Sequence, residues 1–284
     1  MPSPIAIRRK DAPFTPPADF WSDFVERFWE RGATTLRYQA EQPLMTEAEA
    51  LAIFLGLAER FRAGGEADID LYVENGLLKS DIGRLLPAAA DRDIAAYQAR
   101  VTDQLGGRRF SLVTNSVRRE SREHLKRVKA FTRGLIKLIG QDAGWLGADI
   151  FLSNTLKTAF GVHRDSASNF SYIVSGRKRM LVWPCEVFAC RRDLRCAGPK
   201  KNVFLDDVNC EPYRDQAIVL EGGAGDMLYW PASYWHVAES TGKPSLVFNV
   251  PIYLNSAVNR MAAEYYLRKL SVVSSQLASP RTDH

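Results

Sequence analysis

The sequence lacks any run of about 20 consecutive apolar residues, the length that an α-helix needs to cross a bilayer. The basic residues Arg8, Arg9 and Lys10 are not followed by the apolar stretch of a secretory signal. We therefore expect a cytoplasmic protein with no membrane partner.

Cysteine is also scarce, because all 4 cysteines of the 284 residues fall between Cys185 and Cys210. Their spacing lacks the C-x2-C pairs of structural zinc sites, so we expect free thiols in a loop-rich insertion. With 19 Gly and 14 Pro the chain is neither collagen-like nor broadly disordered. A composition of 46% apolar and 25% charged residues is that of an ordinary globular protein with a full core.

The net charge of +5 is concentrated in the segment Arg118–Lys137, which has eight basic and two acidic residues. Such a segment is a possible contact for an acidic or nucleic-acid partner. The alternative is a solvated helix face.

The first half of the chain has the periodicity of helices. We predict helices over Phe20–Arg31 and Thr46–Phe61, the second opened by a capping box of Thr46 and Glu49. Residues 76–105 are predicted helical, with a break at Pro87. A further helix over Ser121–Ile139 is expected to bury a stripe of apolar residues: Leu125, Val128, Phe131, Leu135 and Leu138.

From about Trp145 the pattern changes to short β-type runs separated by turn residues. The sequence therefore predicts an α+β protein with a β-sandwich or barrel core. We expect a mainly helical region over 1–145, the β core over 146–255, and a C-terminal helix and tail over 256–284. Eight strands are predicted: Ala148–Asn154, Thr158–His163, Asn169–Ser175, Arg179–Trp183, Ala217–Leu220, Asp226–Trp230, Trp235–Ser240 and Ser245–Pro251.

Two of the 4 histidines lie in this β region. His163 and Asp165 are two residues apart, so both side chains point to one side of an extended strand. His236 follows a Gly-Asp turn, an apolar strand and a proline bend. Two imidazoles and one carboxylate form the facial triad of non-haem Fe(II) oxygenases. The alternative is that both histidines belong to the core or its rim.

A lysine follows on a neighbouring predicted strand. A tight turn at Gly176 is expected to join the strands on its two sides and to lead into Lys178. An inward-facing ammonium requires an anionic partner, such as the distal carboxylate of a dicarboxylic co-substrate. Alternatively, Lys178 is a surface residue of the basic turn Arg177–Arg179.

Together these segments read H-x-D-x3-N-F-x5-G-x-K-R from His163, then G-D-x-L-Y-x-P-x3-W-H-x2-E-S from Gly225. This double pattern resembles the JmjC-type cupin-like 2-oxoglutarate oxygenases, in particular their asparaginyl hydroxylase and tRNA hydroxylase branch. The match covers roughly residues 150–255. It implies a double-stranded β-helix, the jelly-roll or cupin core.

The resemblance also implies roles for single residues. His163, Asp165 and His236 correspond to the iron ligands, and Lys178 to the anchor of the 2-oxoglutarate C5 carboxylate. Asn169 and Asn249 correspond to polar residues that face the co-substrate pocket. Some relatives have a threonine where this chain has Phe160, and Thr158 is the candidate to replace it.

The implied activity is that of a dioxygenase that uses Fe(II), 2-oxoglutarate and O2 to hydroxylate an unactivated C–H bond. A peptide or protein side chain is the expected substrate; a free amino acid, a small metabolite or a nucleic-acid base is the alternative. Two further readings are a catalytically silent cupin-like binding module and a metal-dependent isomerase or hydrolase. Because relatives often dimerise through terminal helices, a homodimer is also expected.

Overall fold

The structure is a computed structural model, in which the predicted C-terminal helix of 256–284 lies outside the described residues. No helix in the described part of the chain is both long and apolar enough to cross a membrane. The described residues are 5–8, 15–39, 42–74, 76–78, 80–115, 117–139, 146–158, 161–188, 202–205, 208–232, 234–240 and 243–253.

The helices of the described residues precede the β core along the chain, apart from two short 3-10 turns. The predicted capping box is present: the Glu49 amide donates to the Thr46 hydroxyl at 3.2 Å, and the Thr46 amide donates to the Glu49 carboxylate at 2.9 Å. The helices are α1 (Ala18–Arg27), α2 (Glu47–Arg62), α3 (Ile94–Gln104), α4 (Val117–Glu120) and α5 (Arg122–Ile139), with 3-10 turns at Ile82–Arg84, Cys185–Phe188 and Glu211–Gln216.

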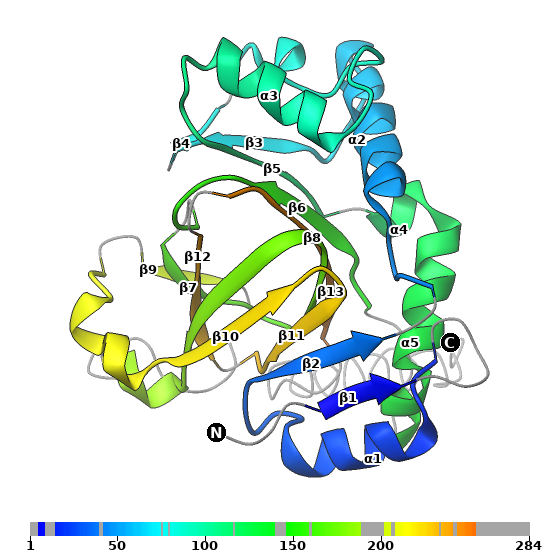
Figure 1. Cartoon of the computed structure of the whole chain (residues 1–284), viewed down its shortest axis with the longest axis vertical. Coiled ribbons are helices and arrows are strands. Elements are labelled where there is room, and N and C mark those ends of the chain that lie inside the picture. Colours follow the sequence, from blue (N-terminus) through cyan, green and yellow to red (C-terminus); the bar gives the residue numbers. More distant parts are fainter. Residues whose placement is uncertain are drawn as a thin grey trace, which may run out of the picture.

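The strands form a strongly curled, jelly-roll arrangement that is antiparallel except for the β1–β2 pair (Figure 1). The predicted α+β class with a β core is therefore confirmed. Strands from the N-terminal half also extend the sheet, because β2 pairs with β11 and β5 with β6. The strands are β1 (Ile5–Arg8), β2 (Thr34–Gln39), β3 (Asp70–Val73), β4 (Gly76–Leu77), β5 (Phe110–Thr114), β6 (Asp149–Ser153), β7 (Val162–Arg164), β8 (Ser168–Trp183), β9 (Val203–Leu205), β10 (Ile218–Gly223), β11 (Asp226–Trp230), β12 (Trp235–Glu239) and β13 (Ser245–Ile252).

One long strand, β8, belongs to both layers of the core. Its first half pairs with β11 and β13, and its second half pairs with β10 and β12. The predicted turn at Gly176 is therefore wrong, since the chain continues as one strand. Gly176 is still required: it has φ +77°, and a Cβ there would lie 2.1 Å from the Pro244 carbonyl oxygen.

A β-bulge interrupts β8 just before this glycine. Ile173 pairs with Val247, whereas Ser175 pairs with Leu246, so two residues of β13 face three of β8. The extra residue is Val174. A bulge of this kind exchanges the faces on which later side chains of the strand point.

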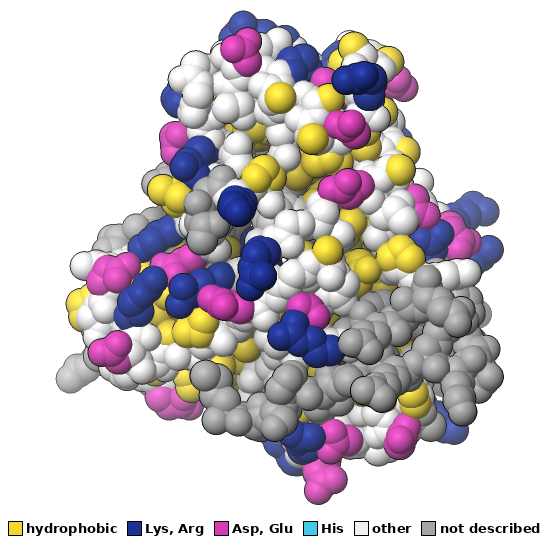
Figure 2. Space-filling view, in the orientation of Figure 1, with side chains coloured by type: hydrophobic (Ala, Val, Ile, Leu, Met, Phe, Trp, Pro, Cys, Tyr) yellow, Lys and Arg dark blue, Asp and Glu magenta, His cyan; other side chains and the backbone are white. Residues whose placement is uncertain are grey.

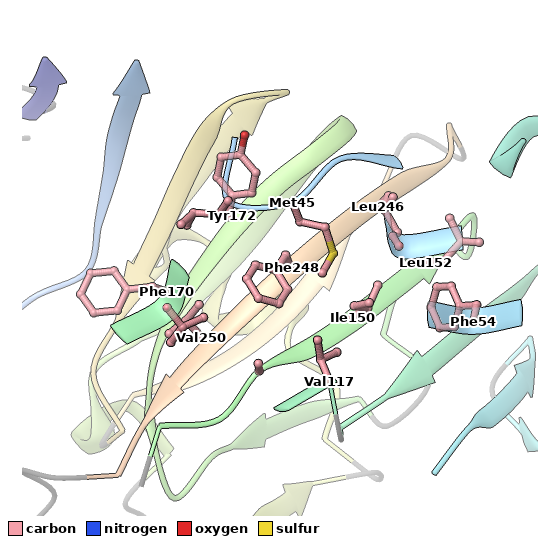
Figure 3. Packing of buried hydrophobic residues seen from close by; sticks show 14 of the residues in the cluster. Met45, Phe54, Val117, Ile150, Leu152, Phe170, Tyr172, Leu246, Phe248 and Val250 are labelled. Carbon is pink, nitrogen blue, oxygen red and sulfur yellow. The ribbon is translucent and has the colours of Figure 1, made fainter. Parts of the chain in front are cut away.

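The side chains on the two faces of β6 and β13 point to different parts of the molecule. On one face, alternate apolar side chains point away from the interior of the jelly roll and pack in the main hydrophobic core with residues such as Met45 and Phe54 (Figure 3). The intervening side chains line the interior: Asp149, Phe151 and Ser153 on β6, and Ser245, Val247 and Asn249 on β13. The outward set is Ile150, Leu152, Leu246, Phe248 and Val250.

Helix α1 docks through its predicted aromatic side, since Phe20, Trp21, Phe24 and Phe28 are all buried. Trp21 packs edge-on against Phe131 of α5 with ring centroids 5.2 Å apart. A Cβ at Gly134 of α5 would lie 2.2 Å from Trp21 Cδ1, so only glycine permits this approach.

The expected helix over 76–105 is wrong in its first part. Strand β4, a 3-10 turn and irregular backbone precede α3, which begins only at Ile94. Long-range side chains stabilise this irregular segment: Arg62 donates to the carbonyls of Gly83, Leu86 and Pro87, and Arg100 donates to those of Arg84 and Leu86. Its carbonyls are thus satisfied without helical hydrogen bonds.

The buried stripe of α5 is confirmed at Val128, Phe131 and Leu135, but Leu138 is 49% exposed and Leu125 only partly buried. His124 and Thr132 are buried instead. Both find polar partners, because Ser121 Oγ lies 2.7 Å from His124 Nδ1 and Thr132 Oγ1 donates to the Val128 carbonyl. Polar side chains satisfied in this way can occupy buried positions.

The cysteine expectation is wrong in part. Cys185 is disulfide-bonded, whereas Cys210 is a free and buried thiol. Cys190 and Cys196 lie outside the described residues.

Candidate metal centre

His163, Asp165 and His236 meet at one point in the core. His163 on β7 lies directly opposite His236 on β12, and their ring centroids are 4.2 Å apart. Asp165 Oδ2 lies 3.4 Å from His236 Nε2. One donor atom from each side chain lies within 4.8 Å of the others, and no other group of this kind occurs in the described ranges. The three residues thus offer two imidazoles and a carboxylate to one ion.

Backbone carbonyls orient both imidazoles. His163 Nδ1 lies 3.1 Å from the Gly161 carbonyl oxygen, and His236 Nδ1 lies 3.3 Å from that of Tyr234. A carbonyl only accepts, so each Nδ1 carries the proton and each Nε2 keeps a lone pair for a metal. Trp230 packs on His236 with ring centroids 4.9 Å apart and restrains that ring further.

The protonation states suit metal binding. Burial, reinforced by the neighbouring His236, lowers the pKa of His163 to about 4, which keeps this imidazole neutral near pH 7. Burial alone would raise the pKa of Asp165, but His236, His163 and the hydrogen bond from Asn169 bring it down to about 2. A neutral imidazole beside an ionised carboxylate is the form in which these groups bind a divalent cation.

Lys178 faces the same interior as the triad. A cavity of about 100 Å³ is lined by His163, Asp165, His236 and Lys178. Burial lowers the pKa of Lys178 to about 8, because the ammonium is partly removed from water. Its neighbours Arg177 and Arg179 are exposed. Lys178 therefore faces the interior and is not a surface residue like its neighbours.

A cluster of hydroxyl groups on the cavity wall was not predicted from the sequence. Ser153 Oγ lies 2.7 Å from Ser111 Oγ and 2.8 Å from Thr155 Oγ1. All three residues line the cavity with Lys178. Alternation along β6 places Ser153 on the same face as Phe151 and Asp149, which is the signal that would have found it.

The remaining predicted site residues surround the triad at different positions. Thr158 lines the cavity, and its Oγ1 accepts a hydrogen bond from the Ala238 amide at 2.9 Å. Asn169 donates to Asp165 Oδ2 at 2.9 Å and accepts from Asn249 Nδ2 at 2.8 Å. Asn249 lines the cavity, whereas Asn169 lines a second cavity that shares Asp165.

The basic segment forms a stripe on the surface of α5. We call the exposed residues Arg122, Lys126, Lys129, Arg133 and Lys137 the basic stripe; they recur every three or four residues and so share one helix face. None of the five has a carboxylate partner in the described part of the chain, whereas Arg127 pairs with Glu49 at 2.8 Å. On the face shown in Figure 2, by contrast, basic and acidic side chains are interspersed.

The family described as "Cupin-like domain" matches residues 58–259. None of the curated proteins matches the chain. Among solved structures, the ribosomal oxygenase YcfD from Escherichia coli is similar with a TM-score of 0.48 and 16% identity over 93% of this chain and 58% of that one. The same protein in complex with cobalt and 2-oxoglutarate has a TM-score of 0.49 and 17% identity, over 93% of this chain and 58% of that one. The chain thus spans less than two thirds of these structures.

Proposed function

Because the chain belongs to the cupin-like domain family, we propose that it is an Fe(II)- and 2-oxoglutarate-dependent dioxygenase. It hydroxylates an unactivated C–H bond, and its substrate is a peptide or protein side chain. One observation carries the proposal: a triad of two imidazoles and a carboxylate shares one cavity with an inward lysine.

The triad fits a ferrous ion by its chemistry. Two neutral imidazoles and one carboxylate occupy one face of a metal and leave the remaining positions open. When bound, iron supplies the O2-dependent oxidation of the substrate, coupled to decarboxylation of 2-oxoglutarate to succinate. The protein fixes the three donor atoms, and Asn169 orients Asp165 by its hydrogen bond.

Lys178 is the residue that would bind the distal carboxylate of 2-oxoglutarate. The ammonium lines the cavity together with the Ser111, Ser153 and Thr155 hydroxyls, which can donate to the same anion. Thr158 keeps its own hydroxyl proton after accepting from Ala238, so it can donate as well. An isomerase or hydrolase on the same fold would not require this cationic end of the cavity.

The substrate assignment rests on the sequence resemblance to hydroxylases of peptide and protein side chains. A free amino acid, a small metabolite or a nucleic-acid base is the alternative. The basic stripe is proposed as a contact for an acidic or nucleic-acid partner, and a homodimer is proposed on the same resemblance.

The decisive experiment is an anaerobic titration of the protein with Fe(II) and 2-oxoglutarate. We expect a weak visible charge-transfer band from chelated iron, and its loss in Asp165→Ala and weakening in Lys178→Ala. Asp165→Ala should also abolish hydroxylation. A folded wild type without the band would refute the oxygenase and favour a silent binding module or another metal chemistry. Full turnover in Asp165→Ala would refute Asp165 as an iron ligand.

A further inference from the structure

Trp230 has a buried indole N–H group without a hydrogen-bond acceptor. The residue is 4% exposed, and its Nε1 finds no partner in the described part of the chain. Trp183 and Trp235, which are also buried in the β core, donate instead to backbone carbonyls at 2.8 and 3.3 Å. An indole nitrogen only donates, and a buried donor without an acceptor costs free energy. The N–H of Trp230 therefore requires an explanation.

Two other indoles lack a partner among the described residues, but their surroundings differ. Trp21 and Trp29 lie in the main hydrophobic core and line neither the cavity of the triad nor the second cavity beside Asp165. Trp230, in contrast, lines the cavity that contains the triad and Lys178. Of these three indoles, Trp230 is therefore the one that a ligand in this cavity would touch.

Trp230 lies at the metal end of this cavity. Its ring packs on that of His236 with centroids 4.9 Å apart. Its backbone lies directly opposite Asn169, the residue that donates to Asp165. Lys178 lies on the second half of β8, which pairs with β10. A dicarboxylate that binds Lys178 through one carboxylate therefore has its other carboxylate on the side of the triad and Trp230.

A carboxylate oxygen of a ligand is the acceptor that this N–H group lacks. An ionised carboxylate only accepts, and a hydrogen bond to an ionised oxygen is stronger than one between neutral groups. The Asp165 carboxylate does not serve Trp230, because its described contacts are with Asn169 and His236. Since the N–H is already removed from water, the donor loses no hydration when the ligand binds.

We propose that the indole N–H of Trp230 donates a hydrogen bond to the C1 carboxylate of 2-oxoglutarate, the carboxylate nearer the metal. Trp230 is then a binding residue for the co-substrate in addition to Lys178. This rests on the proposed function and deepens it, because it assigns a donor to the second end of the same anion. The protein thus binds the co-substrate at both ends and does not leave the C1 end to the metal alone.

The first test observes the N–H group itself by NMR. The full chain is labelled with nitrogen-15 at tryptophan, loaded with Zn(II) and titrated with 2-oxoglutarate. The indole signals are assigned with Trp21→Phe, Trp29→Phe and Trp230→Phe. We expect the proton signal of Trp230 to move downfield, because a hydrogen bond to a carboxylate deshields the donor proton. The signals of Trp21 and Trp29 should stay in place, since both indoles lie outside the cavity.

The second test removes the donor and keeps an aromatic ring against His236. Trp230→Phe should raise the Kd of 2-oxoglutarate about tenfold or more, the effect of losing a hydrogen bond to a charged group. Its affinity for Zn(II) without co-substrate should not change. Trp29→Phe also removes an unpartnered N–H, but outside the cavity, and is the matched control that should alter neither constant. Calorimetry measures both constants, and circular dichroism checks the fold.

An unmoved Trp230 signal at saturation with 2-oxoglutarate, or an equal Kd in wild type and Trp230→Phe, would overturn the inference. Equal losses of Zn(II) and 2-oxoglutarate affinity in Trp230→Phe would also overturn it, because the ring would then act only through His236. The anaerobic iron titration separates this failure from failure of the proposed function. A normal charge-transfer band with an unmoved Trp230 signal leaves the oxygenase intact and removes only this hydrogen bond, whereas absence of both the band and 2-oxoglutarate binding removes both.

Discussion

Lys178 and Ser171 face the same cavity although an odd number of positions separates them on one strand. In a regular strand such residues point to opposite faces. The bulge at Val174 exchanges the faces between them, so that the lysine turns inward. The cationic end of the site therefore depends on one extra residue in β8.

Replacement of this lysine should weaken binding of the co-substrate. Removal of a charge-assisted hydrogen bond costs about 1.5–3 kcal/mol, so Lys178→Ala should raise the Kd of 2-oxoglutarate about 10- to 100-fold. Calorimetry in the presence of Mn(II) measures this. Arg179→Ala is the control, because that side chain lies outside the cavity, is 44% exposed and pairs with Glu221. Equal losses in both variants would contradict the assigned anchor.

The binding of 2-oxoglutarate should depend on pH with a definite sign. Since the pKa of Lys178 is lowered to about 8, the amine is charged below that pH and neutral above it. The apparent Kd should be constant at lower pH and rise up to about tenfold per pH unit above about 8. Lys178→Arg keeps its charge over this range and should give a flat profile. A wild-type affinity independent of pH would contradict the prediction.

Asn169 should act through Asp165 on metal affinity. Loss of the residue that orients a ligating carboxylate typically costs about 10- to 100-fold in metal affinity. Asn169→Leu should show this loss in competition titrations of Mn(II) with a chelator, whereas the surface variant Asn209→Leu should not. Unchanged Mn(II) affinity in Asn169→Leu would mean that Asn169 contributes to packing and not to metal binding.

Gly134→Ala should destabilise the protein although alanine favours helices. The added Cβ would lie 2.2 Å from the fully buried Trp21, and overpacking of this kind costs about 1–3 kcal/mol. Gly56→Ala on α2 is the matched control, because its Cβ meets nothing within 4 Å and should stabilise by about 0.5–1 kcal/mol. Urea unfolding compares the two, and equal shifts would argue against tight packing at Gly134.

The basic stripe should bind polyanions with a steep salt dependence. Fluorescence anisotropy with a single-stranded RNA oligonucleotide should give a slope of log K against log salt of about −0.7 per contacted phosphate. A variant with Lys126, Lys129 and Arg133 changed to Glu should lose this binding. Changing the exposed Arg84, Arg92 and Lys243 to Glu alters the net charge equally and is the control. Equal losses of RNA binding in both variants would mean that the basic stripe is only a solvated helix face.

The sequence was sufficient where the signal is local or rests on rare residues. The capping box of Thr46 and Glu49 is encoded within one helical turn, and the structure contains it. The spacing of His163 and Asp165 predicts that their side chains lie together, and they do, although Asp165 follows β7 and is not part of it. Their meeting with His236 required the fold. The resemblance to cupin-like proteins is confirmed by the family match over residues 58–259.

The sequence was insufficient where distant partners decide the local structure. A glycine such as Gly176 is typical of turns. Here β8 stays continuous, because it pairs with β13 before this residue and with β10 after it. The irregular segment before α3 depends on Arg62 and Arg100 from two helices. Alternation along β6 indicates the face on which Ser153 lies, but its contact with Ser111 joins β5 to β6 and required the fold.

The continuity of β8 has a consequence for how the protein unfolds. Because this strand is paired on both sides in each layer, neither layer can open without releasing it. Its amide hydrogens should be among the last to exchange with solvent. The strand carries Asn169 in one half and Lys178 in the other, so the polar support of Asp165 and the cationic end of the cavity form a single cooperative unit that is lost in the same event.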